Sequence, residues 1–216
     1  MPCNARPFVL FIGISSGASP MKGSNDMNRE QPRASRDHLV FGAVHPNFDY
    51  EDGRQFFRKL SELARAIVAT AEPTFPSRDC LRITSLLNLG LGYDGTATRT
   101  STDDQIIEWV SSVTEKMTPP AIVGCGLKGI FSNRNKSRAW ANGGSRFTWH
   151  DPWSSEIPVS KHHKLRWKPV TYSSGARGHV YLLPNHPSRY PLTTEQGWQN
   201  TITRLREHFV SVAAMA

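Results

Sequence analysis

The stretch PFVLFIGI, residues 7–14, decides the fold class of this 216-residue chain. It is an almost unbroken apolar run that ends at a Gly/Ser turn, which is typical of a strand buried on both faces of a sheet. Such strands belong mainly to parallel sheets covered by helices. The run could be mistaken for the core of a signal peptide, but it is short and follows a single basic residue, Arg6, so we interpret it as a strand.

Other apolar patterns alternate along the chain in the way that an α/β fold requires. Helical spacing is found in residues 51–70, after a capping box at Thr102–Gln105 and after a second box at Thr193–Gln196. Strand-like runs are found at residues 81–90, 121–126 and 179–184. We predict a single α/β domain over residues 1–216, with three layers (α/β/α) around a central, mainly parallel four-stranded sheet.

Two segments fall outside this alternation, the polar residues 17–50 and a long connection at residues 127–178. Ten Lys and Arg residues but only two acidic residues lie between positions 127 and 179, so this part of the chain carries the whole net charge of +8. It also contains interleaved tryptophans, and basic residues with aromatic neighbours indicate a nucleic-acid partner. We interpret residues 127–178 as a basic insertion that binds DNA; the alternative is a solvated loop with incidental charge.

Composition argues against several other classes of protein. The three cysteines, Cys3, Cys80 and Cys125, are far apart and form no CxxC pair or Cys/His pair at zinc-ligand spacing. We therefore expect no disulfide framework, no metal and no cofactor. No apolar run approaches the roughly 20 residues that a membrane helix needs. We expect a cytoplasmic protein, associated with the nucleoid if it is bacterial.

Polar residues follow several of the predicted strands. Ligands of open α/β sheets bind beyond the carboxyl ends of the parallel strands, which meet at one edge. This rule brings together Ser15-Ser16-Gly17, Asn88 and the turn Asn185-His186-Pro187-Ser188, although they are distant in sequence. The basic insertion begins from the same edge, after the third predicted strand. The sequence therefore predicts a polar pocket bordered by a cationic segment.

The motifs GISSG, LLN, VGCG and NHPSRYP, in this order and each at a predicted strand end, resemble those of the uracil-DNA glycosylase superfamily. In that superfamily a Gly-x-Asp/Asn-Pro turn follows the first strand, the asparagine of a Leu-Leu-Asn strand end reads uracil, and a His-Pro-Ser turn follows the last strand. The resemblance covers most of the chain outside residues 127–178. It implies a DNA repair enzyme that flips out uracil, or a related deaminated or damaged base, and hydrolyses its N-glycosidic bond.

The resemblance also implies roles for single residues. Asn88 would read the base edge, Gly13 and Ile14 would border the base, and Phe41 would stack on it. His186 would stabilise the negative charge on the departing base. The expected DNA-binding residues are Ser188, Arg189 and Tyr190 after the last strand, and Arg134, Lys136, Arg138, Lys164 and Arg166 in the basic insertion.

The first motif departs from the superfamily pattern, because Ser15 stands where relatives carry the Asp or Asn that activates water. A serine hydroxyl is a poor base. Three alternatives remain open: another residue such as Asn25 or Asp26 supplies the group, the enzyme is slow and relies on stabilising the leaving base, or the protein binds uracil-containing or single-stranded DNA without cutting it. An unrelated α/β enzyme that acts on nucleosides or phosphates is a further alternative, although the sequence contains no P-loop.

Overall fold

The computed structural model describes residues 8–13, 55–71, 84–88, 110, 112–125, 147–148, 155–187, 189 and 191–213. Its elements are β1 (Val9–Gly13), α2 (Gln55–Ala71), β2 (Thr84–Asn88), β3 (Ala121–Cys125), β4 (Phe147–Thr148), β5 (Ser155–Pro158), β6 (Lys164–Tyr172), β7 (Arg177–Leu182) and α6 (Glu195–Ala213). Residues 112–117, ahead of β3, are also helical. Within these residues no helix is long and apolar enough to cross a bilayer.

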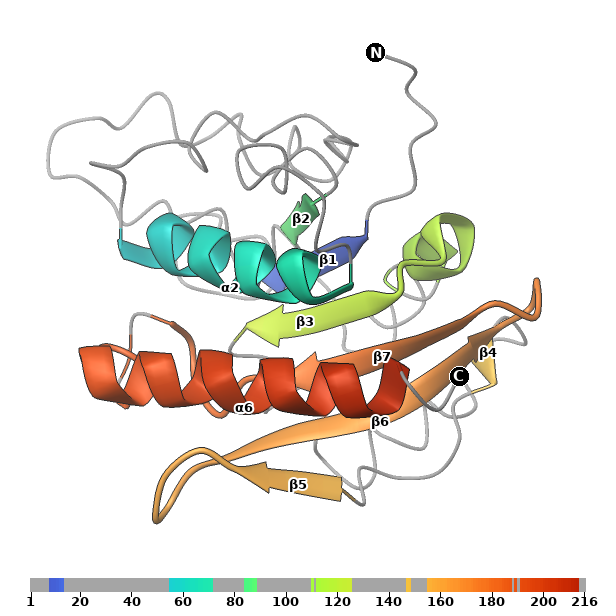
Figure 1. Ribbon diagram of the computed structural model, residues 1–216. Coiled ribbons are helices and arrows are strands. Elements are labelled where there is room, and N and C mark those ends of the chain that lie inside the picture. The colour runs from blue at the N-terminus through green and yellow to red at the C-terminus, as the bar shows by residue number, and fades with distance from the viewer. Residues whose placement is uncertain are drawn as a thin grey trace, which may run out of the picture.

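The described strands form one open, mixed sheet (Figure 1). Their order is β2-β1-β3-β7-β6-β4, and β5 also pairs with β6. Neighbouring strands among β2, β1, β3 and β7 run parallel. β6 runs antiparallel to β7, and β4 and β5 run antiparallel to β6. The predicted α/β class is therefore confirmed, and the sheet is larger and more mixed than the four mainly parallel strands that we expected.

The second half of the predicted insertion is part of this sheet. β4, β5 and β6 all lie within residues 127–178, so the interpretation of this whole segment as a connecting loop was wrong. In β6 the buried side chains include Leu165, Val170 and Tyr172, while Lys164 is exposed. Basic residues therefore share this strand with core residues. Because this segment contains many basic residues, its sequence does not show the regular alternation of apolar and polar residues that predicts a strand.

β1 is buried on both faces, as the run PFVLFIGI predicts. Val9, Leu10, Phe11 and Ile12 are each at most 1% exposed. Successive side chains of a strand point to opposite faces, so both faces of the sheet are covered at β1. One face packs against α2 and α6, which lie side by side in front of the sheet (Figure 1). The core on this face includes Phe11, Val123 and Tyr181 from the strands and Leu60, Leu63, Ile67, Trp198, Leu205 and Phe209 from the helices.

The start of α6 lies one residue later than the predicted capping box. The Thr194 hydroxyl accepts a hydrogen bond from the Gly197 backbone N–H at 3.1 Å and donates one to the Pro191 carbonyl at 2.8 Å. Thr194, not Thr193, is therefore the N-terminal cap. The turn at Pro191 decides between the two threonines, because it presents the carbonyl that orients the Thr194 hydroxyl.

Replacing Gly197 with alanine is expected to destabilise the protein by about 1–3 kcal/mol through overpacking. A Cβ at this position would lie far inside van der Waals distance of the Pro191 carbonyl oxygen and 2.8 Å from Thr194 Oγ1. This clash opposes the gain of about 1 kcal/mol that alanine normally brings to a helix. Urea denaturation measures the change, and the exposed α6 variant Gln199→Ala is the control. A Gly197→Ala protein at least as stable as the wild type would contradict the packing described here.

Candidate functional site

The carboxyl ends of the four parallel strands meet at one edge of the sheet, which we call the strand-end edge. At this edge Gly13 of β1 is in register with Asn88 of β2 and with Cys125 of β3. Leu183, the first residue after β7, donates its backbone N–H to a β3 carbonyl at 3.0 Å. The turn that contains His186 therefore begins beside the end of β3, which lies between β7 and β1 in the sheet. Gly13 and Asn88 lie on neighbouring strands at this edge, and His186 follows the strand on the far side of β3.

His186 lies half-buried in the connection between β7 and α6. Its carbonyl accepts a hydrogen bond from the Arg189 backbone N–H at 2.8 Å, which closes a tight turn. Burial, and secondly the positive charge of Arg189, lower the pKa of the His186 imidazole below its usual range. The imidazole is therefore neutral at neutral pH, with one N–H donor and one acceptor nitrogen. Such a group can donate a hydrogen bond to an oxygen that is gaining negative charge.

Cys125 shares the strand-end edge but does not suit nucleophilic chemistry. Its side chain is fully buried, and burial raises the pKa of its thiol far above the usual range. The reactive form of cysteine is the thiolate, so this side chain is inert at neutral pH. Across the described parts of the chain, no three His, Cys, Asp or Glu side chains group in a way that could hold a metal ion.

Lys59 of α2 is a residue near this site that sequence reasoning missed. It is only 1% exposed, and its ammonium donates hydrogen bonds to the carbonyls of Pro187, at 3.3 Å, and Leu192. Both carbonyls belong to the connection that carries His186. Lys59 lies four residues before Leu63, within the apolar stripe of α2. A lysine inside an apolar helix face is the sequence signal that would have identified it.

The turn between β5 and β6, residues 159–163, lies at the same edge. β6 runs antiparallel to β7, with Arg166 opposite Leu182, so β6 begins where β7 ends (Figure 1). Lys161 and His162 are exposed on this turn. The exposed Lys161 therefore places a positive charge beside the strand-end edge on the β7 side.

Two predicted DNA-binding residues in this region are paired with the same carboxylate. Lys164 Nζ lies 2.6 Å from Glu156 Oε2, and Arg166 Nε lies 3.4 Å from Glu156 Oε1. The hydrogen bond from Lys164 is the main cause that holds the pKa of Glu156 below its usual range. Glu156 is exposed, so water screens these pairs and they contribute little to stability. Their main effect is to neutralise part of the positive charge at this edge.

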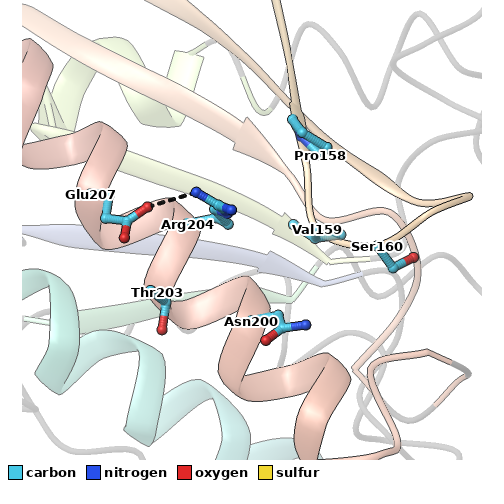
Figure 2. Close-up of a pocket in the computed structure, with 7 residues that line it drawn as sticks. All are labelled: Pro158, Val159, Ser160, Asn200, Thr203, Arg204 and Glu207. Carbon is cyan, nitrogen blue, oxygen red and sulfur yellow. Dashed lines mark hydrogen bonds and ion pairs between the residues drawn. The ribbon is translucent and has the colours of Figure 1, made fainter.

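A polar hollow of about 390 Å³ lies between the same turn and α6 (Figure 2). It is lined by Pro158, Val159, Ser160, Asn200, Thr203, Arg204 and Glu207. Arg204 and Glu207 pair with each other across one wall at 3.2 Å. The residues that line this hollow include no histidine or cysteine, so it lacks the groups that His186 supplies at the strand-end edge.

Two further histidines are partly buried where the second half of α6 meets the sheet, His208 on α6 and His179 on β7. The His208 ring lies 4.1 Å from the Trp167 ring, between centroids, and its Nδ1 is 3.3 Å from the Tyr181 hydroxyl. His179 contacts the same group of rings, with its centroid 6.1 Å from that of Trp167. Burial lowers the pKa of both histidines, and the nearby His179 lowers that of His208 further.

Folding stability is expected to decrease as the pH falls from about 7.5 to 5.5. In the folded state, burial lowers the pKa values of His179, His186 and His208 below the usual value of 6.5. The unfolded chain therefore takes up protons first as the pH drops through 6.5, which favours unfolding. Urea denaturation across this range measures the effect, and the double variant His179→Phe/His208→Phe should reduce it to the contribution of His186. Stability that is constant or rises toward pH 5.5 would contradict the burial of these rings.

Several predicted site residues lie outside the described residues. They are Ile14, Ser15, Asn25, Asp26, Phe41, Arg134, Lys136, Arg138, Ser188 and Tyr190. For Asn88 the structure describes the backbone position in β2. Arg189 is described and exposed, directly after the His186 turn.

Comparisons of this sequence and structure with known protein families, curated proteins and solved structures find no match. The features of this chain that bear on its function are therefore the strand-end edge, the neutral imidazole of His186 and the positive charge of Lys161 beside β7.

Proposed function

We propose that this protein is a base-flipping DNA glycosylase of the uracil-DNA glycosylase type. It takes uracil, or a related deaminated or damaged base, out of the DNA stack and hydrolyses its N-glycosidic bond. The observation that carries the proposal is the arrangement of the strand-end edge, where Asn88 is in register with Gly13 and the turn of His186 begins at the same edge, beside the end of β3. The proposal is also supported by the parallel strands that carry these motifs, with helices α2 and α6 packed against one face of the sheet.

The proposed chemistry divides recognition and leaving-group stabilisation between two residues. The Asn88 amide accepts a hydrogen bond from uracil N3–H and donates one to O4, a pattern that cytosine cannot satisfy. Cleavage of the glycosidic bond leaves negative charge on the departing pyrimidine. The neutral His186 imidazole donates a hydrogen bond to the O2 atom on which this charge develops.

The activation of water is the unusual part of this proposed mechanism. The described residues at the four strand ends, Gly13, Asn88, Cys125 and 183–187, include no carboxylate, and Ser15 occupies the position that relatives use for water activation. A reaction that relies mainly on stabilising the leaving base would favour bases that are already activated for departure. The same observation favours a second candidate function, binding of a flipped base or of single-stranded DNA without turnover.

The experiment that tests the proposal uses single- and double-stranded oligonucleotides that carry uracil, hypoxanthine or xanthine. After incubation with the protein, alkali cleaves the strand wherever a base has been removed. Strand scission that is lost in Asn88→Ala and kept in the α6 surface variant Gln199→Ala supports the glycosylase. Retarded migration without scission supports the second candidate. If no substrate shows either retarded migration or scission, both candidate functions are rejected.

Replacing Glu156 with glutamine is expected to raise the affinity for single-stranded DNA about fivefold at 0.1 M salt, the gain from about one added phosphate contact. The change releases Lys164 and Arg166 from their shared carboxylate. Fluorescence anisotropy with a salt titration measures both the affinity and a salt dependence that becomes steeper. Glu115→Gln is the matched control, since Glu115 accepts from the Ser173 backbone N–H at the opposite end of the sheet. Equal effects of the two variants would place DNA elsewhere on the molecule.

A further inference from the structure

We propose that Lys59 is a positioning residue whose buried side chain holds the connection between β7 and α6 and thereby fixes His186 against the base. The structural part of this inference concerns the fold alone. The catalytic part rests on the proposed function. Lys59 belongs to a different element from every residue of the strand-end motifs, and no motif of the sequence assigns it a role.

Lys59 contacts the connection between β7 and α6 at two positions. Its Nζ donates to the carbonyl of Pro187, the residue next to His186, at 3.3 Å. The same nitrogen donates to the carbonyl of Leu192, close to the start of α6. One side chain from α2 therefore ties both sides of the segment 187–192 to a single point. A backbone segment held at both ends loses most of its freedom to move as a unit.

The surroundings of Lys59 hold its side chain in place. Its Nζ lies 5.4 Å from the centroid of the Trp198 ring, in a cation–π arrangement. The Trp198 indole N–H donates to Glu62 Oε2 at 2.7 Å, and Glu62 is three residues after Lys59 on α2. Burial lowers the pKa of Lys59, and the carboxylates of Glu195 and Glu62 oppose this shift. These contacts join α2, α6 and the His186 connection into one polar group inside the core.

Backbone hydrogen bonds also run within the connection itself. Within it, the Arg189 backbone N–H donates to the His186 carbonyl at 2.8 Å, and the Thr193 N–H donates to the Arg189 carbonyl at 3.2 Å. These bonds shape the turn locally but do not attach it to α2. An apolar side chain at position 59 would fill the same space and leave the two carbonyls without this donor, which is costly inside a core. The connection would then shift away from α2.

The structural part is tested by amide hydrogen exchange in Lys59→Met, a change that keeps the length and volume of the side chain. We expect exchange at Arg189 and Thr193 to become about tenfold faster or more, because their bonds open when the tether is lost. Exchange at Leu183, which bonds to β3, should be unchanged. The control is Val68→Ala, a fully buried position toward the other end of α2. Unchanged exchange at Arg189 and Thr193 would overturn the proposal. If Lys59→Met does not fold, Lys59→Gln, which keeps a donor, takes its place.

The catalytic part is tested by single-turnover release of uracil from a single-stranded oligonucleotide at saturating protein. We expect Lys59→Met to lower this rate about ten- to a hundredfold while the DNA dissociation constant stays within about twofold, because a displaced donor weakens transition-state binding more than ground-state binding. Val68→Ala should change neither quantity. A wild-type rate in Lys59→Met would overturn the positioning role. If the wild-type protein releases no base, the proposed function fails, and the exchange data still decide whether Lys59 holds the connection.

Discussion

Replacing His186 with alanine is expected to lower the rate of base release by about 100- to 1000-fold, the usual effect of removing one donor to a developing oxyanion. The imidazole is neutral because burial and the charge of Arg189 lower its pKa. It can therefore donate a hydrogen bond as charge builds on the departing base. Single-turnover kinetics on a uracil-containing oligonucleotide measure the rate, and anisotropy measures the binding of the same DNA.

The binding measurement separates a catalytic role from a general loss of structure. Binding of DNA to His186→Ala should stay within about threefold of the wild type, because the donor acts mainly in the transition state. His162→Ala is the matched control, since His162 is exposed on the turn at the same edge of the sheet. A rate loss in both variants, or an equal loss of rate and binding in His186→Ala, would argue against leaving-group stabilisation by His186.

Replacing Trp198 with alanine is expected to destabilise the protein by about 3–5 kcal/mol, the usual cost of removing a buried tryptophan. Trp198 is fully buried and is among the largest side chains of the core between α2, α6 and the sheet. Its removal also takes away the indole donor to Glu62 and the ring beside Lys59. Urea denaturation at constant pH measures the loss, which would consume much of the stability of a domain of this size.

Two further variants identify the origin of that effect. Val210→Ala changes an exposed apolar residue of the same helix and should stay within about 0.5 kcal/mol of the wild type. Trp198→Phe keeps an aromatic ring but removes the indole N–H, so it should be intermediate. A Trp198→Ala protein that loses less than about 1 kcal/mol would contradict the packing of α6 on α2.

The parts of the fold that could be predicted are those in which local pattern and burial agree. The run PFVLFIGI contains no polar side chain, and Val9 to Ile12 are buried on both faces. The helical stripe of Leu60, Leu63 and Ile67 is buried against the sheet, as its spacing predicts. Both signals are local, because a strand or a helix shows its buried face through the period of its own sequence.

The parts that were missed depend on contacts between distant segments. β6 carries exposed basic side chains as well as core residues, so its sequence has the composition of a polar loop, and only pairing with β7 makes it a strand. The cap of α6 is Thr194 and not Thr193, because the Pro191 carbonyl orients its hydroxyl. Neither outcome can be read from the spacing of apolar residues.

The sequence by itself determined the α/β class, the buried strands and the order of polar motifs that follow them, because each depends on short-range patterns and on the rule that parallel strands end together. Only the tertiary structure decided that Gly13, Asn88 and Cys125 share one register, that Glu156 pairs with Lys164 and Arg166, and that Lys59 holds the His186 connection. Lys59 and Pro187 are 128 residues apart in the chain. A contact of this kind depends on how α2 packs beside α6, and no local pattern in the sequence encodes that packing.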